Sequence, residues 1–163
     1  MLNCRNATSD DIDLIIELTM KVWPATYTPI LGEEQVAYML GAFYTPQSLA
    51  KQMSQGQQFI ICTEYNVPVA FASYSTDVQE IYKLNKLYIL PDLQGRGIGT
   101  YIIMQLAAAV KQSGPRYLQL NVNRYNTGAI AFYEKAGFIN TATEDIDIGN
   151  GYFMNDYVLQ LAL

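Results

Sequence analysis

Three glycines at alternate positions, Gly95, Gly97 and Gly99, follow an apolar segment that ends at Pro91 and precede an apolar-periodic run from Tyr101. Because glycine has no Cβ, such a loop can approach a ligand closely and adopt conformations that other residues avoid. The helix that follows begins with N–H groups that lack intrahelical partners, and its aligned peptide dipoles make this end partly positive. Helix starts of this kind bind phosphate groups. The segment predicts a phosphate-binding loop, with an ordinary glycine-rich turn as the alternative.

Two common phosphate loops do not fit these residues. A P-loop requires Lys and then Ser or Thr directly after its last glycine, whereas Gly99 is followed by Thr100. A dinucleotide fingerprint requires Gly-x-Gly-x-x-Gly and an acid about 20 residues later. The spacing here is one residue short, and residues 116–123 carry no acid. The pattern Gln/Arg-x-x-Gly-x-Gly/Ala does fit, and residues 94–99 match it.

Histidine is absent from the chain, which excludes Ser-His-Asp and Cys-His catalysis and any histidine metal site. A general acid or base must therefore be Tyr, Asp, Glu, Lys or Cys, or act through water. The net charge of −5 and a pI near 4.6 disfavour a nucleic-acid partner and are compatible with a cationic substrate.

The 163 residues are expected to form a single domain, 1–163, that needs no disulfide or metal to fold. No apolar run approaches the length of a membrane span, and no basic region precedes an apolar stretch at the N-terminus. The chain therefore reads as soluble and cytoplasmic, with no membrane partner. Cys4 and Cys62 belong to no metal or redox spacing, so we expect two reduced, buried thiols and no bound metal.

Helices dominate the elements expected before the first hairpin. Residues 2–7 predict a strand, and apolar residues at helical spacing predict a helix from about Asp11 that loses its regularity around Pro24. A second helix is expected from near Glu33, and a third over residues 46–53 with Thr45 as its N-cap.

Strands dominate the rest of the chain. A hairpin is expected over residues 57–64 and 67–76, and a strand over residues 79–90 leads into the glycine loop and its long helix. A strand over residues 116–122 precedes a short helix that Asn126 caps and Gly137 ends. Strands over residues 139–148 and 152–161 close the chain through a tight Gly-Asn-Gly turn.

Residues 126–138 read Asn-x-x-Ala-x-x-Phe-Tyr-x-x-x-Gly-Phe, a segment that resembles a motif of the GNAT superfamily of N-acetyltransferases. The glycine loop resembles the acyl-CoA pyrophosphate loop of the same superfamily, and the order of elements is similar across nearly the full length. The resemblance implies an α+β fold with one central, mostly antiparallel sheet of six to seven strands. That sheet would splay between the strands at residues 79–90 and 116–122 and carry helices on both faces.

The resemblance also implies acetyl-CoA as cofactor. Backbone groups of the strand carrying Leu87, Tyr88 and Ile89 would pair with its pantetheine arm, and an N–H near Tyr88 or Ile89 would stabilise the thioester oxyanion. Asn126 would bond to the cofactor arm, cap its helix, or do both. The diphosphate would meet the backbone of Gln94, Gly95, Arg96, Gly97, Ile98, Gly99 and Thr100, and Arg96 would add a charge or remain a solvated cation.

Tyr133 is the candidate general acid that protonates the departing thiolate, because a phenol is protonated at neutral pH. Its alternative role is that of a packed aromatic residue. Many relatives carry a Glu on the strand that enters the loop, where this chain has Lys83 and Asn85. Glu80 lies further back on that strand and is a weaker candidate, so the general base is unassigned.

Residues 23–27, 37–40 and 42–45 resemble the substrate-side helices of bacterial polyamine acetyltransferases. The acceptor pocket is therefore expected at Trp23, Tyr27 and Tyr44, with Glu33 or Glu34 as ammonium partners, because aromatic faces and acids attract cations. A buried aromatic core and a solvated helix start are the alternative.

The sequence thus predicts an enzyme that transfers acetyl to a primary amine, a polyamine or another small cationic amine. A protein N-terminus or lysine is the alternative acceptor, and a CoA-binding regulatory module without catalysis is the alternative class. A homodimer is compatible with all three.

Overall fold

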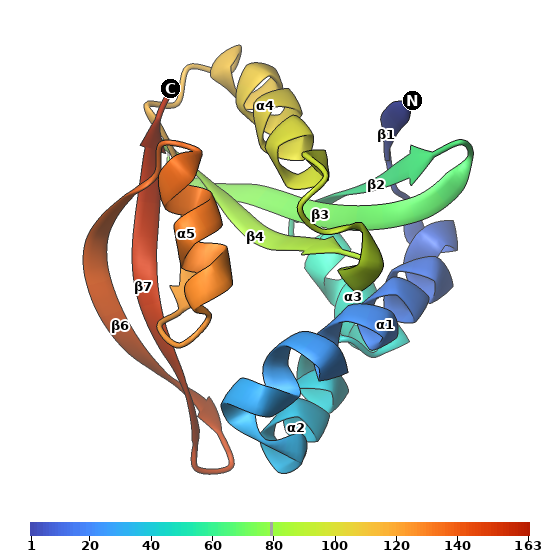
Figure 1. Cartoon of the computed structure of the whole chain (residues 1–163), viewed down its shortest axis with the longest axis vertical. Helices are drawn as coiled ribbons and strands as arrows, with labels where there is room; N and C mark the ends of the chain where they lie inside the picture. The colour runs from blue at the N-terminus through green and yellow to red at the C-terminus, as the bar shows by residue number, and fades with distance from the viewer. Residues whose placement is uncertain (79) are drawn as a thin grey trace. The chain divides into compact units, whose positions relative to one another are not determined.

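The computed structural model describes residues 1–78 and 80–163, in which seven strands and five α-helices follow one another along the chain (Figure 1). The predicted start of the fourth strand, Gln79, lies outside these residues. The elements are β1 (Leu2–Asn6), α1 (Ile12–Leu31), α2 (Glu33–Phe43), α3 (Pro46–Ser54), β2 (Gln58–Glu64), β3 (Val67–Val78), β4 (Ile81–Ile89), α4 (Ile98–Lys111), β5 (Tyr117–Asn123), α5 (Thr127–Lys135), β6 (Ile139–Gly149) and β7 (Tyr152–Ala162).

The strands form one sheet in the order β1-β2-β3-β4-β5-β7-β6. The pairs β1–β2, β2–β3, β5–β7 and β6–β7 are antiparallel, and β4–β5 is parallel. The parallel pairing joins residues 81–84 to residues 117–120, although both strands run further. The mixed sheet of six to seven strands that the sequence predicts is confirmed, with seven strands.

Two compact units divide these elements. The first comprises residues 1–75 and 86–104, and the second comprises residues 76–85 and 105–163. The strands β3 and β4 and the helix α4 each contribute residues to both units.

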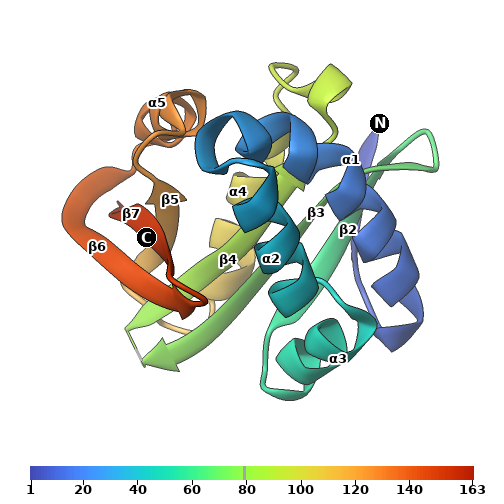
Figure 2. The same cartoon turned by 90° about the horizontal axis from the view of Figure 1, so that it is seen from below.

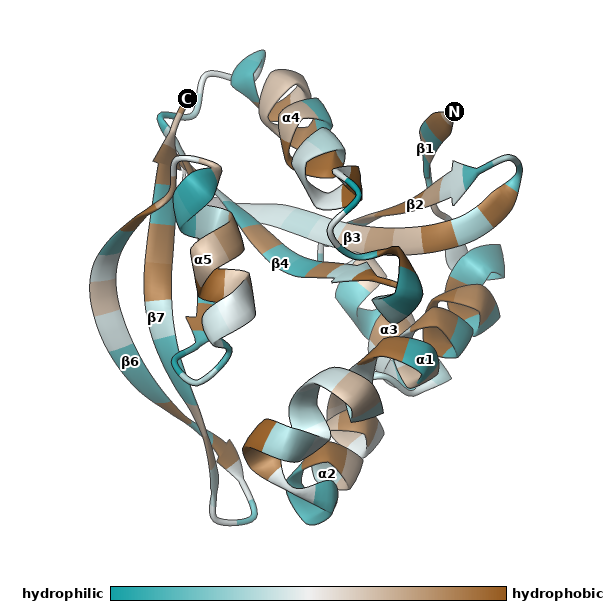
Figure 3. Cartoon of the chain, in the orientation of Figure 1, coloured by the Kyte–Doolittle hydropathy of each residue, from teal (hydrophilic) through white to brown (hydrophobic). Residues whose placement is uncertain are grey.

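In the first unit, α1, α2 and α3 gather on one side of β2 and β3 (Figure 2). Apolar residues recur along α1 at helical spacing, so one stripe of this helix turns inward (Figure 3). The large side chains of the unit that are completely shielded from solvent include Ile15, Leu49, Ile61 and Phe71. Burial of this apolar surface fixes the helices on the sheet.

The expected break of the first helix at Pro24 is wrong. The helix α1 runs without interruption from Ile12 to Leu31 and contains both Pro24 and Pro29. A proline inside a helix removes one backbone hydrogen bond and disfavours the preceding turn. Val22 and Trp23, at 2% and 4% exposure, are buried immediately before Pro24, and this tertiary packing outweighs the local penalty.

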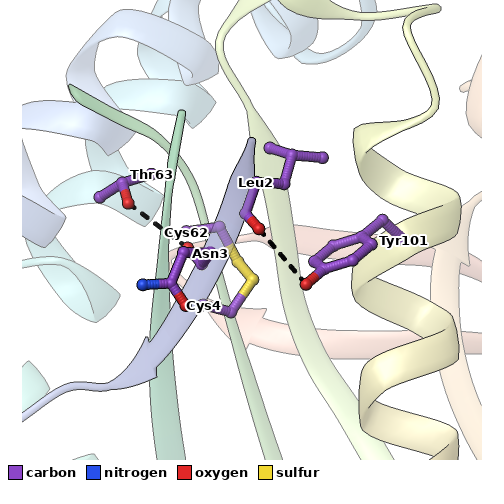
Figure 4. The surroundings of a disulfide bond; sticks show 6 residues. All are labelled: Leu2, Asn3, Cys4, Cys62, Thr63 and Tyr101. Carbon is purple, nitrogen blue, oxygen red and sulfur yellow. Dashed lines mark hydrogen bonds between the residues drawn. A yellow bond between two sulfur atoms is a disulfide. The ribbon is translucent and has the colours of Figure 1, made fainter. Parts of the chain in front are cut away.

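The expectation of two reduced thiols is also wrong. Cys4 and Cys62 form a disulfide that joins β1 to β2 (Figure 4). The two residues lie 58 apart in sequence but are direct partners in the antiparallel register, with their Cα atoms 4.1 Å apart. Sequence spacing carried no sign of this pair because the strand pairing, which the spacing does not encode, brings the two cysteines together.

In the second unit, β6 and β7 form a long hairpin (Figure 1), and β7 also pairs with β5. The turn between them uses the predicted Gly149, Asn150 and Gly151, which all have positive φ angles. Leu118, Leu120 and Val122 are buried on one face of β5, whereas the polar residues between them are partly exposed. No helix in the described residues is both long and apolar enough to cross a membrane.

Candidate active site

The glycine loop lies in the first unit and has the backbone geometry that phosphate binding needs. Gly95 and Gly97 have φ angles of 78° and 83°, a region that favours glycine. A Cβ added at either residue would meet nothing within 4 Å, so the space beside the loop is open. The first intrahelical hydrogen bond of α4 runs from the N–H of Tyr101 to the carbonyl of Gly97. The N–H groups before Tyr101 therefore have no acceptor within the helix.

The side chains of the loop contact their surroundings within the same unit. Ile98 is buried and anchors the helix start, while Arg96 is exposed and pairs with Glu64 across 3.4 Å. The Gln94 side-chain amide donates to the carbonyl of Ile89 at 3.3 Å. The loop thus presents backbone N–H groups and a surface cation, which fits the diphosphate of a nucleotide-like ligand. The backbone of Leu87 and Ile89 is expected to pair with a pantetheine arm, and the Ile89 carbonyl already accepts this hydrogen bond from Gln94.

The three expected acceptor residues lie together in the first unit. The Trp23 ring centroid is 4.5 Å from that of Tyr27 and 5.2 Å from that of Tyr44. Tyr88 joins them from β4, with its centroid 6.0 Å from that of Trp23 and 5.5 Å from that of Phe71. Trp23 and Tyr44 are buried, whereas Tyr27 and Tyr88 are partly exposed. We call Trp23, Tyr27, Tyr44 and Tyr88 the aromatic cluster.

A cation already contacts the aromatic cluster. The Lys86 Nζ lies 5.2 Å from the centroid of Tyr44 and 5.9 Å from that of Phe59, within cation–π range. Burial raises the pKa of the Tyr44 hydroxyl above its ordinary value, so this hydroxyl stays protonated. Glu33 and Glu34 are exposed in the first turn of α2, where acids stabilise a helix start. Their role as ammonium partners stays a prediction.

In the second unit, Asn126 caps α5 as predicted, since its Oδ1 accepts from the N–H of Ala129 at 3.3 Å. The helix ends in the predicted glycine stop. The N–H of Phe138 donates to the carbonyl of Tyr133, the N–H of Gly137 donates to that of Glu134, and Gly137 has a φ angle of 104°.

Tyr133 is partly exposed, and its ring packs 5.5 Å from that of Phe138 and 5.2 Å from that of Phe132. Phe138 is itself buried at 3% exposure. The contact between Tyr133 and Phe138 is the hydrophobic contact that accompanies this helix stop. The Tyr133 ring thus packs against the end of its own helix, and its role as catalytic acid stays a prediction.

Positions 83 and 85 of β4 carry Lys and Asn in place of an acid. The weaker candidate base, Glu80, already has a basic partner. Glu80 pairs with Arg116 at 3.6 Å, and both side chains are exposed. A buried acid does lie in the second unit, however. Asp156 on β7 is 5% exposed, and no motif marks it. The only sequence signal for it is an acidic residue inside an otherwise largely apolar closing strand.

A family model described as an acetyltransferase (GNAT) domain matches residues 27–161. Among curated proteins, an uncharacterized N-acetyltransferase of Methanocaldococcus jannaschii is 30% identical over 142 residues, which are 82% of this chain and 59% of that protein. The chain thus matches little more than half the length of this relative. A spermidine N(1)-acetyltransferase of Thermoplasma acidophilum is 23% identical over 94% of this chain and 95% of its own length.

A peptidyl-lysine N-acetyltransferase of Salmonella typhimurium is 32% identical over 95 residues, which are 58% of this chain and 59% of that protein. Among solved structures, the PaiA N-acetyltransferase of Thermoplasma acidophilum in complex with coenzyme A superposes with a TM-score of 0.82 at 21% identity. The superposition covers 100% of this chain and 99% of that one, so the two share a fold.

Proposed function

Because the chain belongs to the acetyltransferase (GNAT) family, in which acetyl-CoA is the acyl donor, we propose that it acetylates the primary amine of a polyamine or a similar small cation. The aromatic cluster carries this proposal. Two of its rings are partly exposed, and the Tyr44 ring already has an ammonium group beside it. The net charge of −5 and the similarity to a spermidine acetyltransferase support the same acceptor class.

Acetyl-CoA would be held by the glycine loop and the end of β4. In this proposal, the backbone N–H groups of residues 94–100 bind the diphosphate, and Arg96 adds a charge-assisted contact. Leu87 and Ile89 pair with the pantetheine amides as a neighbouring strand would. Asn126 contributes to the same binding in addition to capping α5. The open space beside Gly95 and Gly97 supports this assignment.

The reaction needs an amine that has lost its ammonium proton. Its nitrogen attacks the thioester carbon, the C–N bond forms, and an N–H near Tyr88 or Ile89 stabilises the oxyanion. The C–S bond then breaks, and the Tyr133 hydroxyl protonates the departing thiolate. The packing of the Tyr133 ring against Phe138 supports this role.

A thiol-release assay tests the acceptor. With acetyl-CoA present, spermidine and spermine are expected to release CoA faster than amino acids, aminoglycosides or peptides. A lysine-containing peptide is the second candidate, favoured by the similarity to a peptidyl-lysine acetyltransferase. Preference for that peptide would replace the polyamine proposal. Tight acetyl-CoA binding without thiol release from any amine would instead support a regulatory module.

Two further sequence predictions stay predictions. A homodimer is to be tested by sedimentation. A cytoplasmic location is in tension with the Cys4–Cys62 disulfide, because stable disulfides are rare in reducing compartments. Thiol labelling of the protein in freshly lysed cells would measure how much of this disulfide exists there.

A further inference from the structure

In the second unit, the face of the sheet that carries Lys83 also carries a buried acid, Asp156, two strands away. In the parallel register, Lys83 of β4 is the partner of Gln119 on β5, and partners in register share a face. Asn121 and Asn123 follow on the same face of β5, because alternate residues of a strand point the same way. Asp156 of β7 is the partner of Asn123. The face that carries Lys83 therefore also carries Asp156.

Hydrogen bonds fix Asp156 on this face. The Asn121 Nδ2 donates to the Asp156 Oδ2 at 3.3 Å and to the Glu144 Oε2 at 3.0 Å. Glu144 of β6 is the register partner of Asp156 and is exposed. One amide thus bridges two carboxylates and holds both near each other. Asp156 itself is 5% exposed, although Gln119 and Asn121 beside it are only partly buried.

The pKa of the Asp156 carboxyl is shifted by the groups around it. Burial raises the pKa of its carboxyl above the ordinary value, and the negative charge of Glu144 raises it further. The hydrogen bond from Asn121 and the charges of Lys83 and Arg124 act in the opposite direction and are weaker in sum. A carboxylate with a raised pKa is a stronger proton acceptor near neutral pH.

We propose that Asp156 is the general base of this acetyltransferase, that it takes the proton of the acceptor ammonium, and that Asn121 positions its carboxylate. The inference rests on the proposed acetyl transfer to an amine. An ammonium group carries three hydrogens, and the amide product keeps one. Asp156 accepts the first proton and passes it to solvent. The second leaves the nitrogen after attack and restores the Tyr133 hydroxyl, whose own proton goes to the thiolate. Charge and atoms balance, with CoA and one proton released.

In this assignment the base lies on β7, two strands away from Lys83 of β4 and on the same face of the sheet. Lys83 is one of the charges that lower the pKa of Asp156, although burial, the largest cause, raises it.

The test is Asp156→Asn, which keeps an oxygen acceptor for Asn121 but cannot take a proton. With the amine that the wild type turns over fastest, we expect kcat to fall about a hundredfold. The acidic limb of the kcat–pH profile should disappear, while calorimetric affinity for acetyl-CoA stays unchanged. The matched control is Asp147→Asn, an exposed residue of the same strand pair, which should behave as wild type.

A second variant tests the pKa argument. Glu144→Gln retains an acceptor for Asn121 but removes the negative neighbour, so the acidic limb should move to lower pH with kcat at its plateau largely kept. A kcat within twofold of wild type in Asp156→Asn would overturn the inference, as would an unchanged acidic limb in that variant. A loss of acetyl-CoA affinity in Asp156→Asn as large as its loss of kcat would also overturn the inference, because Asp156 would then have a structural role. Failure of the proposed function is seen separately, since the wild type itself would then release no thiol.

Discussion

Tyr133 has two roles that one substitution separates. Its ring completes the helix stop with Phe138, and its hydroxyl is the proposed acid. Tyr133→Phe keeps the ring, so the fold and the acetyl-CoA affinity should be unchanged. We expect kcat at saturating acetyl-CoA to fall about a hundredfold, the order that a positioned acid contributes. The control is Tyr125→Phe, which alters a tyrosine that is 65% exposed. An unchanged kcat in Tyr133→Phe would remove this residue from the chemistry.

Lys86 places a positive charge beside the Tyr44 ring of the aromatic cluster. A polycationic acceptor at the partly exposed rings would be repelled by this charge. Lys86→Met keeps the apolar stem and removes the charge, so the KM for spermidine should fall about twofold to fivefold, as 0.5 to 1 kcal/mol implies. The KM for acetyl-CoA should not change. Lys51→Met, an exposed lysine of α3, controls for net charge. A higher KM for spermidine in Lys86→Met would show instead that Lys86 helps to bind the acceptor.

Two residues show where sequence reasoning succeeds and where it fails at this scale. Gly97 and its loop were predictable because φ preference and motif spacing are local properties. Asp156 was not, because its significance comes from the register that places it opposite Asn123 and Glu144. The strands β5, β6 and β7 meet there, and no motif records the register of their pairing.

At the scale of elements, the glycine loop links β4 to α4 through a conformation that only glycine adopts without strain. Gly97→Ala would force an alanine to a φ angle of 83°, which costs about 1 to 2 kcal/mol. We expect lower stability in urea unfolding and weaker acetyl-CoA binding by calorimetry. Gly41→Ala is the matched control, because Gly41 lies inside α2 with open space around it. That change should stabilise the protein by about 0.5 to 1 kcal/mol and leave acetyl-CoA binding unchanged. Equal acetyl-CoA affinity of Gly97→Ala and the wild type would argue against the loop as the diphosphate site.

The disulfide between β1 and β2 ties down an edge strand. It closes a loop of 58 residues that contains α1, α2 and α3, and chain entropy assigns such a cross-link about 4 kcal/mol. Reduction should therefore lower the free energy of unfolding by up to that amount in urea with dithiothreitol. The double variant Cys4→Ala/Cys62→Ala should be insensitive to the reductant. Equal stability of the wild type with and without dithiothreitol would show that the cross-link contributes nothing.

Much of this element layout could be predicted, and the misses share one cause. Strand alternation around Leu120 and the cap at Asn126 are local signals, and both elements formed as expected. The continuation of α1 through Pro24 and the Cys4–Cys62 pair depend on contacts with other elements. Local propensity is a weak guide wherever tertiary packing decides the outcome.

At the scale of the whole molecule, the two compact units share β3, β4 and α4, since each of these elements contributes residues to both. Unfolding one unit would therefore disrupt elements of the other. We expect one cooperative transition in urea, in accordance with the sequence prediction of a single domain, which stays a prediction.

The chain's one tryptophan makes this test specific. Trp23 is buried in the first unit, so its fluorescence reports that unit, whereas amide hydrogen exchange of β5 and β7 reports the second. Coincident midpoints from the two probes, and from far-UV circular dichroism, would support a single cooperative domain. Separate midpoints would mean that the units unfold independently. If the midpoints are separate, acetyl-CoA at 100 times its Kd should raise the free energy of unfolding of a unit that binds it alone by about 2.7 kcal/mol. The other unit should then be unchanged. If the free energies of both transitions rise together by that amount, binding requires both units to be folded.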